Sequence, residues 1–163
     1  FITSDDAENI LIRKKDIYDG AVPSGNAVAM LNLIRLGKIT ADPELELKAE
    51  ATGQAFSRIV GQAPAGYTML MSALDFTFGP SSEVVIAGDL QADDTTDMLK
   101  ALRKEFIPNK VVILRPNEES EITRISGYTK SLSSKGGKAT AYVCRNFSCR
   151  LPVTEPGKML EFL

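Results

Sequence analysis

Hydrophobic side chains recur every three or four residues through the first half of the chain, which is the spacing of an amphipathic helix. The pattern predicts three helices, which begin just after Pro23, at Pro43 and near Pro64. Each proline stands where a helix tolerates it, in or just before the first turn. We expect Gly37 to end the first helix and Gly79 to end the third. Because short loops join them, the three helices should form an antiparallel layer.

The spacing changes in the second half, where short apolar runs are bounded by turn-forming residues. Residues 83–89 read EVVIAGD and residues 110–116 read KVVILRP, and both runs predict buried strands. A helical pattern lies between them, with Leu102 and Phe106 on its apolar face. A strand, a helix and a second strand at this spacing predict a βαβ unit with parallel strands.

The remaining sequence completes a small α/β unit. Residues 117–139 are polar and predict a loop or a hairpin, residues 139–145 predict a third strand, and residues 155–163 a short closing helix. The expected fold class is mixed α and α/β: antiparallel helices over residues 1–80, followed by a small α/β domain with a parallel βαβ core over residues 81–163.

Composition and charge limit the classes of partner that the chain is expected to bind. Apolar residues make up 44% of the chain and the net charge is −2, with no segment rich enough in Lys or Arg to neutralise a row of phosphates. We therefore expect no nucleic-acid partner. No apolar run reaches the ~20 residues that span a bilayer, so we expect no membrane partner and a soluble, cytoplasmic protein. Because the chain opens with Phe1 and not Met, we interpret it as a piece of a longer protein.

The chain contains no histidine and two cysteines, which limits its chemistry. A Ser-His-Asp or Cys-His arrangement cannot be assembled from it, and the four nitrogen or sulfur ligands of a structural zinc site are not present. We expect no metal and no cofactor. Acid–base chemistry would fall to Asp, Glu, Lys or Tyr side chains.

The two cysteines, Cys144 and Cys149, are separated by four residues and do not form a C-x-x-C motif. Nothing nearby in the sequence indicates a basic environment or a helix N-terminus that would lower a thiol pKa. We favour a reduced Cys144 that points from its strand into the core. A disulfide across a bent loop stays open as the alternative.

A polar cluster precedes the first helix and is the main candidate for a site. It consists of Lys15, Asp16, Asp19, Ser24 and Asn26. The two residues at the helix start, Ser24 and Asn26, would orient a polar ligand or an anion towards the unpaired N–H groups there. The alternative is a solvated loop in which Ser24 serves only as the N-cap of the helix.

Three phrases of the sequence together resemble one protein family. They are KDIYDGAVPSGNAVA near the start, EVVIAGD in the middle, and AYVCRNFSCRLPV near the end. The chain resembles the C-terminal part of the thioredoxin-domain-containing proteins of the spermatogenesis-associated protein 20 type, called YyaL-like in bacteria. In that family a thioredoxin-like domain precedes a helical toroid similar to six-hairpin glycosidases. The cysteine motif of the thioredoxin-like domain is absent from this chain.

The resemblance implies that residues 1–80 complete the (α/α) toroid and that the polar cluster lies at its mouth. Asp16 and Asp19 are then candidate catalytic carboxylates for a sugar-like ligand, one of them acting with an acid from helices outside this chain. Lys15 would bind hydroxyls or a negative group, beside Ser24 and Asn26. The partner of the segment is the rest of its own parent chain, and the segment alone should be inactive.

Two further expectations follow from the resemblance. The alternative function is a scaffold or interaction module that presents a thioredoxin-like domain to client proteins. Helix faces left bare without the rest of the toroid also predict that the isolated segment self-associates.

Overall fold

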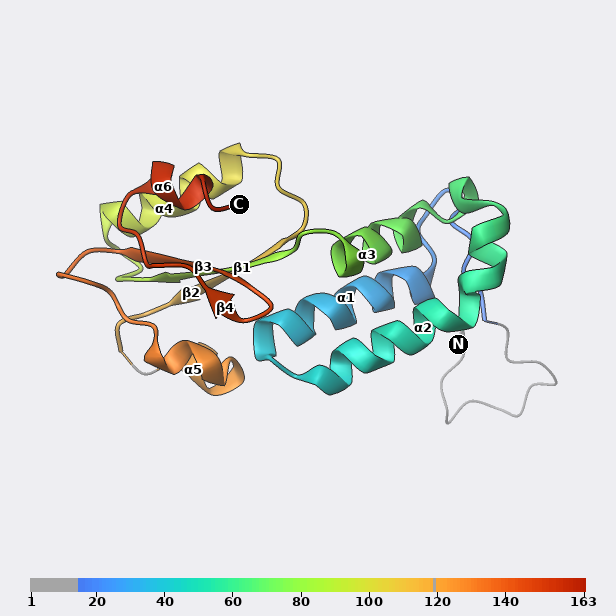
Figure 1. Ribbon diagram of the computed structural model, residues 1–163, viewed down its shortest axis with the longest axis horizontal. Helices are drawn as coiled ribbons and strands as arrows, with labels where there is room; N and C mark the ends of the chain where they lie inside the picture. Colours follow the sequence, from blue (N-terminus) through green and yellow to red (C-terminus); the bar gives the residue numbers. More distant parts are fainter. Residues whose placement is uncertain (1–14, 119) are drawn as a thin grey trace. The chain divides into compact units, whose positions relative to one another are not determined.

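The computed structural model describes residues 15–118 and 120–163, which divide into two compact units (Figure 1). Of these residues, the first unit holds those up to Arg35 together with Pro43–Gly79. The second holds Leu36–Asp42 and Pro80–Leu163. The expected fold class is confirmed, since helices come first and an α/β unit with a parallel strand pair follows. That the helices complete a toroid stays a prediction.

The helices of the first unit bury their apolar faces against one another. They are α1 (Gly25–Thr40), α2 (Pro43–Gln62), the 3-10 turn η1 (Pro64–Gly66) and α3 (Thr68–Phe78). The buried apolar side chains of this unit are Ile17, Ala27, Met30, Leu31, Ile34, Ala49, Val60, Tyr67, Leu70, Ala73 and Phe76. Proline starts α2 and η1 as the sequence predicts, because its fixed φ suits the first helical residue.

The expectation that Gly37 ends the first helix is wrong, because α1 continues to Thr40. The left-handed residue that stops it is Ala41, with a φ of 56°. The N–H of Asp42 then donates to the carbonyl of Gly37 at 3.3 Å, which satisfies one of the carbonyls left over at the helix end. A glycine inside a helix lowers stability without ending the helix, so the presence of Gly37 alone does not mark this boundary.

The second unit is built on a four-stranded mixed sheet. Its strands are β1 (Ser82–Ala87), β2 (Lys110–Arg115), β3 (Thr140–Arg145) and β4 (Ser148–Cys149), in the spatial order β2-β1-β3-β4. The β1–β2 pair is parallel, and α4 (Asp93–Lys104) connects these two strands. The predicted βαβ unit is therefore confirmed. The pairs β1–β3 and β3–β4 are antiparallel.

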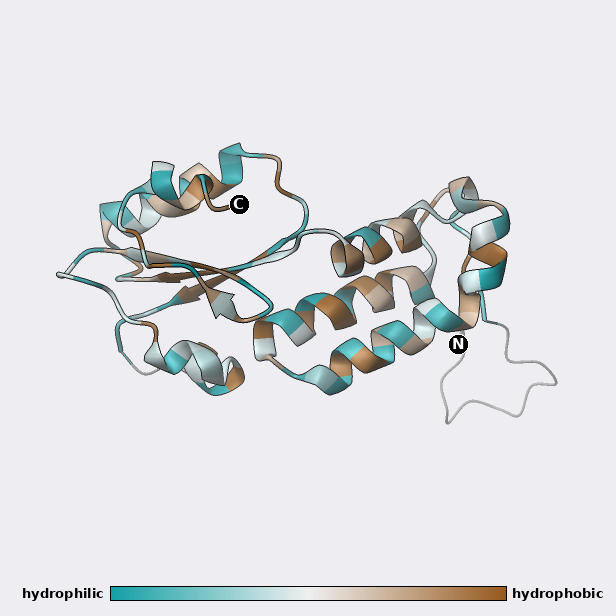
Figure 2. Cartoon of the chain, viewed as in Figure 1, coloured by the Kyte–Doolittle hydropathy of each residue, from teal (hydrophilic) through white to brown (hydrophobic). Residues whose placement is uncertain are grey.

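Helices cover both faces of this sheet (Figure 1). On one face α4 and the closing helix α6 (Pro156–Leu160) pack through Met98, Leu102 and Met159 against Val84 and Ile86 of β1. On the other face α5 (Glu121–Ile125) and the 3-10 turn η2 (Gly127–Ser131) pack against the alternate residues of the same strands. Because both faces are covered, β1 is buried at every position, including the polar Ser82 and Glu83 at its start, and the rest of its ribbon is hydrophobic (Figure 2).

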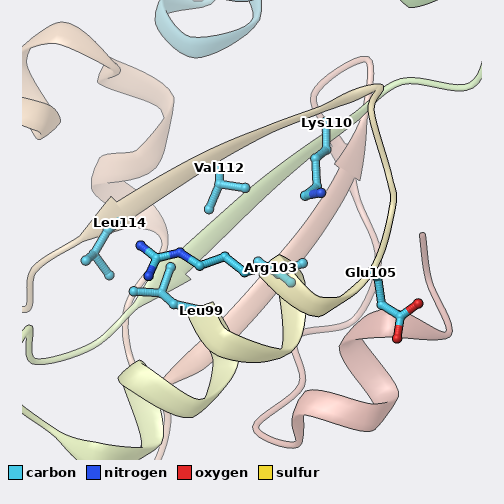
Figure 3. A pocket seen from close by; sticks show the side chains of 7 residues that line it. Leu99, Arg103, Glu105, Lys110, Val112 and Leu114 are labelled. Atoms are coloured by element: carbon cyan, nitrogen blue, oxygen red, sulfur yellow. The ribbon is translucent and has the colours of Figure 1, made fainter.

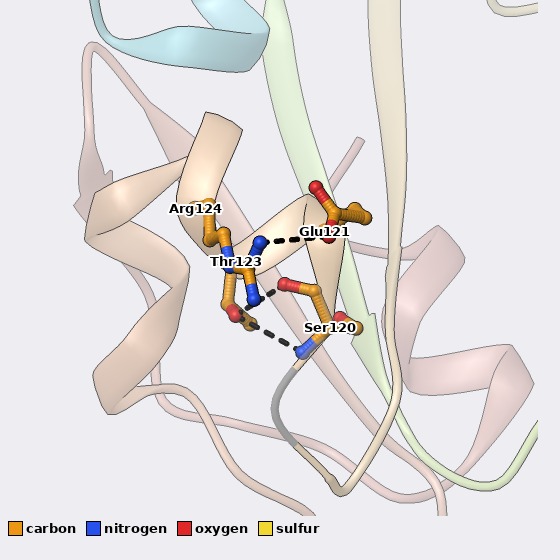
Figure 4. A network of polar contacts seen from close by, with 4 residues as sticks. All are labelled: Ser120, Glu121, Thr123 and Arg124. Atoms are coloured by element: carbon orange, nitrogen blue, oxygen red, sulfur yellow. Dashed lines mark hydrogen bonds and ion pairs between the residues drawn. The ribbon is translucent and has the colours of Figure 1, made fainter.

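Two sequence expectations are corrected in this unit. Phe106 lies beyond the end of α4 and is 92% exposed, so it does not belong to the apolar face of that helix. The polar stretch 117–139 contains α5 and η2 and is not only a loop. The start of α5 is held locally: the N–H of Ser120 donates to Thr123 Oγ1 at 3.3 Å, and Arg124 pairs with Glu121 at 2.9 Å (Figure 4). Such short-range polar contacts let a polar sequence form a helical turn.

The favoured reduced state of Cys144 is also corrected. Cys144 does point from β3 into the core, as expected, but its sulfur forms a disulfide with Cys149 of β4. The two residues are register partners of adjacent antiparallel strands. Their proximity follows from the tight turn at Asn146 and Phe147, which are both in the left-handed region.

Across the described residues, we find no helix with the length and apolar character needed to traverse a bilayer.

Candidate functional site

Asp19 is the best-anchored member of the polar cluster. Its Oδ1 accepts a hydrogen bond from the Ser24 N–H at 2.8 Å, and its Oδ2 accepts one from the Met69 N–H at 2.7 Å. The N–H of Asp19 itself donates to the carbonyl of Gly66 at 3.0 Å. Met69 is the second residue of α3, so the carboxylate stands at a helix N-terminus, where its charge is stabilised. Asp19 therefore fastens the segment before α1 onto the start of α3.

Ser24 has the capping role that the sequence left as an alternative. Its Oγ accepts a hydrogen bond from the N–H of Ala27, the third residue of α1, at 3.2 Å. The Ser24 side chain is buried, and the backbone N–H of Ser24 donates to Asp19 Oδ1. Ser24 thus holds the start of α1 in place.

Asp16 and Asn26 are brought together by the fold. The Asn26 side-chain amide donates to the backbone carbonyl of Asp16 at 2.6 Å, and Asp16 Oδ1 accepts from the Tyr18 N–H at 3.1 Å. Asp16 is half-buried and Lys15 is exposed. The five predicted residues therefore lie in the loop before α1 and in the first turn of that helix, and this loop is hydrogen-bonded to the starts of α1 and α3.

Tyr18 is a surface residue that the sequence analysis did not select. It lies between the two aspartates in sequence and its side chain is 62% exposed. One edge of the ring meets Tyr67 at a centroid distance of 6.0 Å and an angle of 89°. A Cβ added to Gly66 would come within 3.1 Å of the ring, so the glycine leaves room for it. The only signal in the sequence is an aromatic residue inside a charged loop.

This arrangement offers hydrogen-bonding groups beside an exposed aromatic ring. An ionised carboxylate has about four lone-pair sites, so Asp19 can still accept a bond from a ligand after the two that it makes to the backbone. In the part of the chain that the structure describes, no group of three or more Asp, Glu, Cys or His side chains is placed to hold a metal ion. The loop therefore presents hydrogen-bond acceptors beside an exposed aromatic ring.

A second concave surface lies in the α/β unit, between α4 and the edge strand β2 (Figure 3). Its volume is about 400 Å³. Leu99, Leu102, Val112 and Leu114 give it an apolar floor, and Arg103, Glu105 and Lys110 give it a charged rim. Burial lowers the pKa of Lys110. We call this surface the α4–β2 groove.

The sequence is similar to curated proteins over nearly its whole length. Spermatogenesis-associated protein 20 from Homo sapiens is 34% identical over 153 residues, which cover 93% of this chain and 20% of that protein. The protein of the same name from Rattus norvegicus is 33% identical, with 93% and 19% covered. An uncharacterized protein from Caenorhabditis elegans is 27% identical, with 94% and 21% covered.

These similarities confirm the resemblance inferred from the three sequence phrases. The chain spans about a fifth of the length of the curated relatives that it matches. No model of a known protein family matches the chain. No solved structure matches it either.

Proposed function

Because the chain is related to proteins of the spermatogenesis-associated protein 20 type, we propose that it supplies one wall of a carbohydrate-binding cleft in a larger protein. The observation that supports this proposal is the ordered loop from Lys15 to Asn26. It combines carboxylates, an amine and an exposed tyrosine ring on a backbone fixed by hydrogen bonds. A preorganised polar and aromatic surface suits a ligand with many hydroxyls, because little ordering is needed on binding.

The residues of the loop divide into two roles. Asp16, Lys15 and Tyr18 are the side chains placed to touch a ligand, since each is at least partly exposed. Asp19 and Ser24 hold the loop, because each already accepts a backbone hydrogen bond at a helix start. If the cleft also cleaves or epimerises a sugar, Asp16 or Asp19 would act with a second carboxyl group from elsewhere in the parent protein. The isolated chain should then bind sugars weakly and turn nothing over.

A thermal-shift screen of a full-length protein that carries this segment tests the proposal. The probes are mono- and disaccharides, amino sugars and sugar phosphates. A ligand at ~100 times its dissociation constant should stabilise the protein by about 2.7 kcal/mol. The Asp16→Asn and Tyr18→Ala variants should lose the shift, whereas Asp97→Asn, at an exposed carboxylate on α4, should keep it. Sugar shifts of equal size in all four proteins would contradict the assignment, as would the absence of any shift in the wild type.

A second candidate function is a protein-binding module that positions a thioredoxin-like domain against client proteins. The α4–β2 groove favours it, because an edge strand beside an apolar floor can pair with an extended peptide. Retention of an unfolded, carboxymethylated protein on the immobilised full-length protein would support this function. Retention should fall in Val112→Asp and persist in Asp16→Asn. Equal retention by both variants would contradict it.

A further inference from the structure

The disulfide of the α/β unit joins two residues in different surroundings. Cys144, on β3, is fully buried, whereas Cys149, on β4, is exposed. They are five positions apart, so the bond closes a very short loop. A loop of this size restricts the unfolded chain less than a long one does, and the entropic stabilisation is correspondingly small. A purely structural purpose therefore explains this bond poorly.

A buried carboxyl group lies directly across the sheet from the buried sulfur. Glu83 of β1 is the register partner of Cys144 in the antiparallel β1–β3 pair. Residues paired in this way point to the same face, with Cβ atoms about 5 Å apart. Glu83 is 0% exposed, and its Oε1 makes no hydrogen bond among the described residues, although Lys38 Nζ lies 3.7 Å away.

The protonation of this carboxyl group is set by its surroundings. Burial raises the pKa of Glu83, and a hydrogen bond from the Phe147 N–H and the charge of Lys38 oppose that rise. The other ionisable neighbour is Tyr128, on η2; burial raises its pKa to about 12, so it stays neutral at physiological pH. Glu83 is thus a buried acid whose cationic partner among the described residues is Lys38.

The turn between the two cysteines is held by contacts that do not involve sulfur. The Phe147 N–H donates to Glu83 Oε2 at 3.2 Å, and Lys38 Nζ donates to Asn146 Oδ1 at 3.1 Å. The Phe147 ring meets the Tyr128 ring edge-on at 5.3 Å, and Lys38 Nζ lies 5.5 Å from the Phe147 ring centre. If the disulfide were reduced, these contacts would keep the two sulfurs close together. The bond can therefore open and close without unfolding of the hairpin.

We propose that Cys144 and Cys149 form a thiol–disulfide exchange site that accepts electrons from an external dithiol, with Glu83 as the proton donor. A thiolate of the dithiol attacks Cys149 Sγ, forming a mixed disulfide and breaking the Cys144–Cys149 bond. The electron pair of that bond leaves on Cys144 Sγ as a buried thiolate. Glu83 donates its proton to this sulfur, and the resulting carboxylate is stabilised by Lys38.

The second half of the exchange completes the transfer of two electrons from the dithiol to the protein disulfide. The second thiolate of the dithiol then attacks the dithiol sulfur that is bonded to Cys149 Sγ. This attack releases Cys149 as a thiolate, which takes a proton from water. Glu83 regains a proton from solvent. The protein disulfide is reduced to two thiols, and the dithiol is oxidised to a disulfide. The site is independent of the carbohydrate cleft proposed above, because all of its residues belong to the sheet unit.

The first test is reduction of the oxidised full chain by dithiothreitol under native conditions, with thiols trapped by iodoacetamide and counted by mass spectrometry. The rate should rise in proportion to the dithiothreitol concentration and should not change in urea below the unfolding transition. A rate that saturates at the rate of global unfolding would overturn the proposal, because the bond would then be an inaccessible structural cross-link.

The second test compares Glu83→Gln with Glu121→Gln, which removes an exposed carboxyl group on α5. Reduction should slow at least tenfold in Glu83→Gln, and its pH profile should follow the ionisation of dithiothreitol alone. Glu121→Gln should keep the wild-type rate and profile. If Glu83→Gln does not fold, Glu83→Asp, which keeps a carboxyl group, should show an intermediate rate with the wild-type profile. Wild-type rates and profiles in the Glu83 variant that folds would overturn the role of Glu83.

A third test identifies the attacked sulfur with oxidised glutathione as the probe. The Cys144→Ser variant keeps the exposed Cys149 and should form a mixed disulfide with glutathione. The Cys149→Ser variant keeps the buried Cys144 and should react at least tenfold more slowly. Equal reactivity of the two variants would overturn the assignment of Cys149 as the attacked residue.

Discussion

At the scale of single residues, Asp19 shows that a carboxylate in a charged loop can serve the fold. Asp19 was selected from the sequence as a carboxylate for chemistry, and in the structure both of its oxygens accept backbone hydrogen bonds. The bond to Met69 joins residues 50 positions apart. Periodicity and local motifs carry no information about such a partner, so only the neighbouring role of Ser24 as an N-cap could be anticipated.

Replacing Asp19 by alanine should destabilise the helical unit. Two N–H groups, of Ser24 and Met69, would lose a charged acceptor, and hydrogen bonds to charged groups contribute about 1.5 to 3 kcal/mol each. We expect a total loss of about 3 to 6 kcal/mol for the two bonds, measured by urea unfolding followed by circular dichroism. Asp97→Ala, at an exposed ion pair, should change stability by less than about 1 kcal/mol. Equal effects of the two substitutions would show that Asp19 does not anchor the loop.

Two glycines should respond to alanine in opposite directions. A Cβ at Gly88 would lie 2.5 Å from Thr95 Oγ1 and 3.3 Å from the backbone of Ala139, so the chain would have to shift. We expect Gly88→Ala to destabilise the protein by about 1 to 3 kcal/mol. Gly61, in α2, has open space around it, so Gly61→Ala should stabilise by about 0.5 to 1 kcal/mol. Urea midpoints that move in the same direction would contradict this steric account.

At the scale of elements, the strands were predicted more accurately than the helix ends. The apolar runs located β1, β2 and β3 to within a residue or two, because the central positions of each strand are apolar. The prediction that β2 is buried is wrong, because it is an edge strand in which only Val111 and Ile113 are buried. The end of α1 was misplaced because a glycine inside a helix resembles a helix terminus in the sequence. The turns of α5 were missed because local polar contacts, and not an apolar stripe, hold them.

The contact between the last turn of α1 and β1 gives a pH-dependent prediction. Lys38→Met removes the cation 3.7 Å from the buried Glu83 carboxyl group and leaves that charge unpaired. Breaking a buried pair from one side costs about 3 to 5 kcal/mol, and we expect about 3 kcal/mol at a pH above the folded pKa of Glu83. The loss should become smaller as the pH falls, because a protonated Glu83 needs no counter-ion.

The wild type should also respond to pH through Glu83. Its pKa is raised above 4.5 in the folded chain, so the folded state binds more protons than the unfolded state between the two values. The stability that Glu83 contributes to the folded state is therefore fully present below pH 4.5 and is lost as the pH rises through the folded pKa. Urea unfolding at pH 5 and pH 7 measures this, with Glu83→Gln as the control that should show a flatter profile. A Lys38→Met loss that is greater at pH 5 would contradict the assignment.

At the scale of the whole molecule, sequence patterns predicted the order of the elements but not the residues that meet across the fold. The fold class and the parallel pair followed from local periodicity. The contact between Tyr128 and Phe147 and the opposition of Glu83 and Cys144 depend on which strands become neighbours. The disulfide was left open for the same reason, because spacing alone does not show whether two cysteines face each other.

The isolated chain is expected to self-associate, a proposal carried by exposed apolar residues in the edge strand β2 and in the connection before it. Phe106 is 92% exposed and Val112, on the edge strand β2, is 37% exposed beside the α4–β2 groove. Sedimentation velocity over a concentration series should show dimers or larger species. The Phe106→Ser/Val112→Lys variant should be monomeric, because a charge on the edge blocks strand pairing. Leu151→Ser, at another exposed position, should associate like the wild type. A monomeric wild type at every concentration would refute the proposal.

The strand order β2-β1-β3-β4 also has a consequence for synthesis on the ribosome. The central strand β1 is made first, yet its antiparallel neighbour β3 begins at Thr140, more than 50 residues later. At about 5 to 20 residues per second, that delay lasts roughly 3 to 12 seconds. During this time one edge of the most hydrophobic strand has no partner. Binding by chaperones should therefore concentrate on nascent chains that have exposed β1 and not yet β3.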